Sequence, residues 1–166
     1  MTINKAFDAS KVFSFGLNQA IHTMALRLFP TGYLVSETEA PETYQALCDR
    51  LNAGKPMMVY SGGSNETIYG DKEINWAFRA WHDWCHWKGG FDFTEEGEAA
   101  ACEMQIEHLM QVYGDSEDTR EWASILRAEV NGQVQYEAIH GSFPQDQAAF
   151  IAAYVNNPET ALFKRF

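Results

Sequence analysis

The sequence contains little cysteine, no long apolar run and, in its second half, few basic residues. Its three cysteines form no CxxC pair, and an odd number without framework spacing argues against a disulfide-stapled secreted domain. No stretch approaches the roughly 18 apolar residues of a membrane span, and the first residues lack the basic-then-apolar order of a signal peptide. We therefore expect a cytoplasmic protein with no membrane association.

The acidic charge is concentrated in one half of the chain. Residues 91–166 carry 14 acidic and 4 basic groups, whereas residues 1–90 carry 9 and 8. Such a surface repels a phosphate backbone, and no basic patch opposes it, so nucleic-acid binding through a basic face is not expected. An acidic protein can instead meet a basic partner, which keeps open the alternative of a non-enzymatic interaction or inhibitor protein that binds a host protein.

Length and periodicity predict one mainly α-helical domain over residues 1–166. With 46% hydrophobic and 14% aromatic residues, the chain is long and apolar enough to bury a core. Apolar residues recur at helical spacing in the first helix, at Leu17, Ile21, Met24 and Leu28. The architecture that we expect is a helical bundle around a central hairpin at about 72–113, with a minor extended or β segment near 57–60.

The central hairpin is the stretch NWAFRAWHDWCHWKGGFDFTEEGEAAACEMQ (75–105). Asp71 is a good N-cap for a first helix from about Lys72 to Trp87, and Gly89-Gly90 breaks that helix. Asp92 and Glu95 have the spacing of a capping box for a second helix ending near Tyr113. The pattern predicts two helices joined by a short reversal.

Two histidines and a glutamate define a candidate metal site in this hairpin. His82 and His86 are four residues apart, so on a helix they present two imidazoles on one face. Glu98 lies one to two turns inside the second helix, at about the depth of the histidines in an antiparallel pair. Two histidines and one carboxylate with open positions suit a divalent zinc, iron or manganese ion. The sequence HDWCH is not HExxH, so the metalloprotease motif is absent.

Neighbouring residues receive secondary roles in this hypothesis. Asp83 is about 100° round the helix from His82, which suits a general base better than a ligand. Cys102 is an alternative third ligand. Gln105 follows on the face of Glu98 and is a candidate substrate contact. The same histidines can also be hydrogen-bonded core residues with no metal, and that interpretation stays open beside the metal site.

A glycine-rich loop supplies the other candidate substrate contacts. The apolar run from Pro56 to Tyr60 leads into SGGSN (61–65), where Ser61 and Asn65 offer hydrogen bonds to an unknown small-molecule substrate. The loop lacks the GxxxxGK[ST] and GxGxxG patterns, so a plain turn is the competing interpretation.

His82-Asp83 also resembles the dyad of HD-domain phosphohydrolases, helical enzymes that bind a divalent metal. The resemblance implies that His22 and one of Asp115, Asp118 or Asp146 complete the site. The longer run FRAWHDWCHWKGGFDFTEEGEAA resembles small phage and prophage proteins with an HDxxH segment followed by Gly-Glu. This second resemblance covers about a fifth of the chain; it implies that these residues act as a unit and that the source is viral, and it names no reaction.

Residues 124–139 are ambiguous because they contain Asn131-Gly132. This dipeptide is typical of a hairpin turn between alternating segments. The upstream residues nevertheless have clear helical periodicity and a good cap at Ser116, so the pattern favours a helix.

Overall fold

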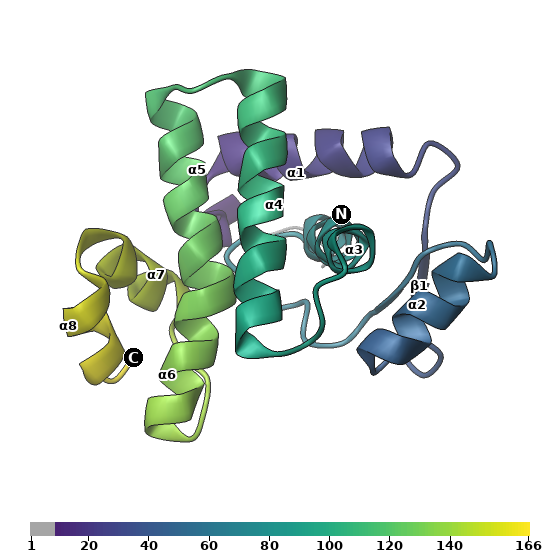
Figure 1. Cartoon of the computed structure of the whole chain (residues 1–166). Coiled ribbons are helices and arrows are strands. Elements are labelled where there is room, and N and C mark those ends of the chain that lie inside the picture. Colours follow the sequence, from purple (N-terminus) through teal and green to yellow (C-terminus); the bar gives the residue numbers. More distant parts are fainter. Residues whose placement is uncertain (1–8) are drawn as a thin grey trace, which may run out of the picture. The chain divides into compact units, whose positions relative to one another are not determined.

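The structure is a computed structural model that describes residues 9–166, and its compact parts are two units, Met1–Phe93 and Thr94–Phe166. The prediction of a mainly helical protein with a minor β segment is confirmed (Figure 1). In the described part of the chain, no helix is long and apolar enough to cross a membrane. The expectation that residues 1–166 form one domain stays a prediction.

Over residues 9–93, the first unit combines three α-helices with one small parallel sheet. After a 3₁₀ turn at Ala9–Lys11, its elements are α1 (Phe15–Leu28), β1 (Leu34–Ser36), α2 (Tyr44–Asn52), β2 (Met58–Tyr60) and α3 (Lys72–Gly89). β1 and β2 pair in parallel with Val35 opposite Val59, so α2 is the crossover helix of a short βαβ unit. The predicted extended segment is β2, whereas β1 was not predicted.

Helix α3 is the core of the first unit. One side packs against α1, which crosses it steeply (Figure 1), and the expected stripe of α1 is buried at Leu17, Ile21 and Met24. The other side lies against the βαβ unit, where Trp76, Trp84 and Trp87 surround a cluster formed by Leu47, Met57, Val59 and Ala80. Because α3 is enclosed on both sides, the polar side chains of Asn75 and His86 are buried with its apolar ones.

The second unit is helical throughout. Its elements are α4 (Glu95–Tyr113), α5 (Glu117–Arg127), a π-helical turn η2 (Ala128–Gly132), α6 (Gln133–His140), α7 (Gln147–Asn156) and α8 (Pro158–Phe163). Figure 1 shows α4 and α5 side by side, with α6 continuing the direction of α5. Ser116 caps α5 in a capping box with Thr119, as its position predicted.

The residues around Asn131-Gly132 are helical and form no hairpin turn. Gly132 has φ −62° and ψ −43°, which is right-handed helical backbone, whereas the tight hairpin turn of an Asn-Gly pair requires positive φ. A Cβ at Gly132 would lie 3.0 Å from the ring of Tyr154 and 3.3 Å from that of Phe150. Glycine therefore stands here because α7 packs closely against this turn, and not because the chain reverses.

One predicted cap was wrong. Asp92 does not begin α4; Thr94 does, and its hydroxyl accepts a hydrogen bond from the Gly97 amide at 3.2 Å. Thr94 stands directly before three acidic residues of the first turn, which is where acidic side chains best complement the helix dipole. The helix still includes Glu98, now in its first turn.

Candidate metal centre

The end of α3 positions both histidines. Asp71 caps the start of the helix through a 2.8 Å hydrogen bond from the Glu73 amide, as predicted, and Gly90 ends it in the left-handed conformation with φ 72°. This reversal directs the next residue back along the helix, so the Phe91 amide donates to the carbonyl of His86 at 2.9 Å. The last two turns of α3 therefore carry His82 and His86 next to the backbone that follows the helix.

A hydrogen bond to a carbonyl sets the tautomer of His86. Its Nδ1 lies 2.9 Å from the carbonyl oxygen of Phe91, and a carbonyl only accepts, so Nδ1 carries a proton and donates. In the neutral imidazole, Nε2 then holds the lone pair. The side chain is only 1% exposed, and the ring of Phe93 meets it edge-on with centroids 4.8 Å apart. His86 is thus oriented as metal-binding histidines are, through a bond from its other ring nitrogen.

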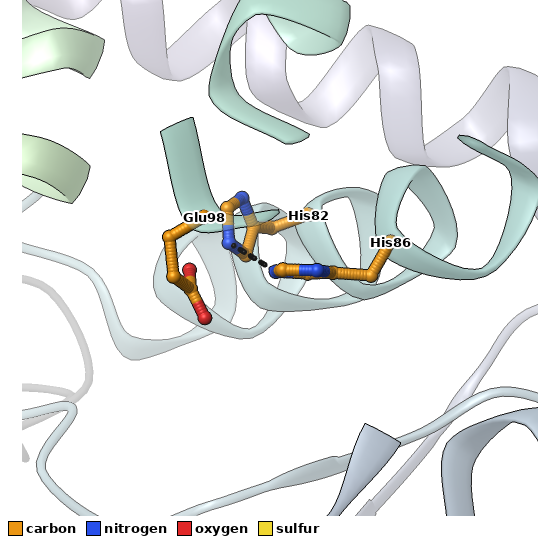
Figure 2. Close-up of side chains that lie close together, drawn as sticks. All are labelled: His82, His86 and Glu98. Carbon is orange, nitrogen blue, oxygen red and sulfur yellow. Dashed lines mark hydrogen bonds between the residues drawn. The ribbon is translucent and has the colours of Figure 1, made fainter. Parts of the chain in front are cut away.

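The two imidazoles meet through their Nε2 atoms. Nε2 of His82 lies 3.0 Å from Nε2 of His86, and the rings are nearly perpendicular at 85° (Figure 2). Because His86 Nε2 holds the lone pair, the proton of this hydrogen bond belongs to His82. The ring of Phe78 stacks on His82 at 5.8 Å and restricts its rotation. Both imidazoles therefore lie on one face of α3, as the four-residue spacing predicted.

Glu98 completes the group that the sequence predicted. One possible ligand atom from each of His82, His86 and Glu98 lies within 4.8 Å of the other two, and Figure 2 shows the three side chains together. Neither Asp83 nor Cys102 belongs to this group, which was sought among the described residues. Asp83 is half-buried on α3, and its role as a general base stays a prediction.

Cys102, the alternative third ligand, lies outside the group of His82, His86 and Glu98. Burial, followed by the charge of Glu103, raises the pKa of its thiol to about 12. The side chain is fully buried, and a metal is bound by the thiolate, not the thiol.

We expect Cys102 to resist alkylation in the folded protein. Iodoacetamide at pH 8 should modify Cys48, which is half-buried, and leave Cys85 and Cys102 unmodified until denaturant is added. Because the pKa of Cys102 is higher in the folded state, its contribution to stability should also fall as pH rises from about 9 toward 12. Mass spectrometry of the labelled peptides measures the first effect, and labelling of Cys102 at the rate of Cys48 would contradict it.

The glycine-rich loop after β2 is anchored from α3. Arg79 donates to the carbonyls of Tyr60 and Gly62, both at 2.6 Å, and Trp76 donates to the carbonyl of Ser61 at 3.2 Å. Asn65 is exposed. These bonds give the loop a structural function as a connector between β2 and α3. A substrate contact at Ser61 or Asn65 stays a prediction, as does one at Gln105, which is fully buried on α4.

The residues of the HD-domain alternative have other local roles. His22 is exposed on α1. Asp115 forms a bidentate salt bridge with Arg120, with hydrogen bonds of 2.8 and 3.1 Å. Asp146 caps α7 by accepting a hydrogen bond from the Ala149 amide. No group of metal-binding side chains among residues 9–166 contains His22.

Sequence reasoning missed the groups that orient the histidines. The Phe91 carbonyl and the ring of Phe93 are in place because FDF follows directly after the double glycine. The ring of Phe78 comes from α3 itself, one turn before His82. The glycine break was recognised, but only the left-handed geometry of Gly90 shows that the chain turns back onto His86.

No protein family model, curated protein or solved structure matches this chain.

Proposed function

We propose that this protein binds one divalent metal ion through His82, His86 and Glu98 and uses it to hydrolyse a small substrate. The observation that supports this most directly is the pair of Nε2 atoms 3.0 Å apart. Two nitrogens on a tetrahedral zinc ion, with bonds of about 2.0–2.1 Å, are about 3.3 Å apart. The pair is therefore spaced as two ligands of one ion are, without a change of helix geometry.

Protonation of the pair also supports a metal site. The Phe91 carbonyl already holds the proton of His86 on Nδ1, so only the proton of His82 must leave Nε2 for both lone pairs to face an ion. Glu98 supplies the negative charge that such an ion requires, and its carboxylate must close in from a separation of up to 4.8 Å. Rotation about the side-chain bonds of a glutamate covers such a distance.

The chemistry follows from three protein ligands and an open position. A divalent ion held this way would lower the pKa of a bound water toward 7 and polarise a substrate oxygen. In the proposal Asp83 would serve as the proton acceptor, and Gln105, Ser61 and Asn65 would contact the substrate. Zinc fits the hydrolytic role best, and the same ligand set also accepts iron or manganese.

The test is the metal content of the purified protein and its variants. Purified wild-type protein should bind one equivalent of zinc, iron or manganese by inductively coupled plasma mass spectrometry. The conservative variants His82→Gln and Glu98→Gln should each bind less than a tenth as much. Glu96→Gln is the matched control, because Glu96 is an exposed glutamate in the same turn of α4 and should leave metal content unchanged.

Two results would overturn the proposal. A wild-type protein with no stoichiometric metal after reconstitution would remove the site and leave the histidines as hydrogen-bonded core residues. Undiminished metal in both His82→Gln and Glu98→Gln would place the metal elsewhere. The first result would favour the acidic interaction protein, for which binding to a basic partner protein is the assay.

A further inference from the structure

Strand β1 forms an open edge of the small sheet in the first unit. The Leu34 amide donates to the Met57 carbonyl at 2.8 Å, and the Ser36 carbonyl accepts from the Ser61 amide at 3.0 Å. In a parallel ladder, the residue between two such partners directs its own N–H and C=O to the opposite side. The backbone groups of Val35 therefore point away from β2, and in the described part of the chain they have no hydrogen-bond partner.

The side chains at this edge are apolar and exposed. Leu34 is 45% and Val35 37% exposed, and as neighbours in a strand they face opposite sides of the sheet. Val59, which stands opposite Val35, is only 1% exposed, so the core covers this face at β2 and leaves it open at β1. An edge with unpaired backbone groups and exposed apolar side chains is a template for the addition of another strand.

A hollow opens where the two strands end. It has a volume of about 480 Å³ and is lined by the last residue of β2 and by the segment after β1, namely Tyr60, Glu37, Thr38, Ala40, Pro41 and Glu42. In open parallel sheets, ligands bind at this carboxyl end of the strands. Tyr60 stands opposite Ser36 and so shares a sheet face with Leu34. The hollow therefore adjoins one face of the open edge.

The ring of Tyr60 is held in place although the residue is 51% exposed. It lies so close to the following loop that a Cβ at Gly62 would come within 2.3 Å of it. The guanidinium of Arg79 lies over the ring at 5.8 Å and also donates to the carbonyls of Tyr60 and Gly62. A rigid, exposed tyrosine offers contact area to a partner at a low cost in conformational entropy.

The charge of the hollow favours a basic partner. Glu37 and Glu42 line it without any lysine or arginine, and neither carboxylate forms an ion pair with another residue that the structure describes. A residue of an added strand on the Tyr60 face would lie next to these carboxylates, and its neighbour in sequence would lie beside Val35. The edge thus fits a strand in which basic and aliphatic residues alternate.

We propose that β1 binds an extended segment of a partner protein, in which basic and aliphatic residues alternate, as a third strand of the sheet. The backbone of the segment pairs with Val35, its aliphatic side chains cover the Val35 side chain, and a lysine or arginine enters the hollow beside Glu37 and Glu42. This surface goes beyond the proposed function and does not depend on it, because none of its residues belongs to the proposed metal centre.

Binding is tested with the fluorescein-labelled peptide GVKVRVG and the full-length protein. Fluorescence anisotropy at fixed ionic strength should show saturable binding. The acidic peptide GVEVEVG should not bind, and neither should GVKPRVG, which keeps both basic residues but disfavours strand pairing through its proline. Amide hydrogen exchange followed by NMR locates the contact: at saturation, the Val35 amide should exchange at least about tenfold more slowly, because exchange then requires release of the added strand.

Variants separate strand addition from general attraction to acidic charge. Val35→Pro removes the outward N–H without breaking a bond to β2, as proline on an edge strand does, and should abolish binding while a circular-dichroism melt reports an intact fold. Glu37→Gln and Glu42→Gln should each raise the dissociation constant about threefold, as expected for an exposed ion pair. Glu39→Gln is the matched control, because Glu39 is exposed in the same segment but does not line the hollow, and it should not change the dissociation constant.

Three results would overturn the proposal. They are the absence of saturable binding of GVKVRVG, unchanged exchange of the Val35 amide in the bound state, and weakening by Glu39→Gln as large as that by Glu37→Gln. The exchange and glutamate measurements decide the matter even if Val35→Pro does not fold. His82→Gln should lose metal and bind the peptide as the wild type does, so failure of the metal site leaves this surface standing.

Discussion

His86→Ala should weaken metal binding about 100-fold and also destabilise the metal-free protein. The side chain is 1% exposed and bonded at both ring nitrogens, to His82 and to the Phe91 carbonyl. Truncation leaves a cavity and an unsatisfied carbonyl, at a combined cost of about 2–5 kcal/mol. In the proposed site, loss of one of three ligands should cost about 3 kcal/mol of metal affinity, or a factor of about 100.

His82→Ala is the comparison for that variant. His82 is half-buried, and its removal should cost a similar factor in metal affinity but only about 1 kcal/mol of metal-free stability. Urea unfolding in the presence of a chelator measures stability, and competition with a zinc-sensitive dye measures affinity. Equal destabilisation by the two substitutions would contradict the role assigned to the His86–Phe91 bond.

Trp81→Ala should be the most destabilising single change in the first unit. Trp81 is fully buried on α3, and truncation of a buried tryptophan costs about 3–5 kcal/mol. For a chain of this size, each 1 kcal/mol lowers the melting temperature by about 2–4 °C, so a fall of about 6–20 °C is expected in a calorimetric or circular-dichroism melt.

Trp87→Ala is the matched control on the same helix. Trp87 is half-buried and donates a 2.9 Å hydrogen bond to Asn52. Truncation removes this bond and should cost only about 1–2 kcal/mol of stability. If Trp87→Ala lowered the melting temperature as much as Trp81→Ala, the buried side chain of Trp81 would not be the main stabilising contact of α3.

The helices were predictable because their signals are local. Asp71 and Ser116 cap the helices for which they were chosen, and the stripe of α1 is buried at the expected positions. β1 was missed because it is three residues long and its Leu34 and Val35 are partly exposed, so neither length nor alternation marks it. A strand of this kind is stabilised by its pairing with β2, and this contact between segments distant in the sequence cannot be read from the residues of β1 alone.

The pairing of the two histidines was predictable for a similar reason. The spacing of His82 and His86 is a property of one helix, and the meeting of their Nε2 atoms is confirmed. The cap was misplaced at Asp92 because Asp92 and Thr94 are both good capping residues near the same acidic turn. At the π-helical turn Ala128–Gly132, Tyr154 packs closely against Gly132. Hydrophobic periodicity along the sequence does not predict a contact of this kind.

The bond between His86 and the Phe91 carbonyl spans the C-terminal end of α3, where helices fray. Opening of that last turn separates the carbonyl from the ring and releases the imidazole from its position beside His82. If the proposed site binds its metal only in the closed form, the metal would stabilise that form by mass action, and local opening would be linked to metal release. Under the proposal, substitutions in 87–91 that touch no ligand should lower metal affinity in proportion to the loss of the closed form.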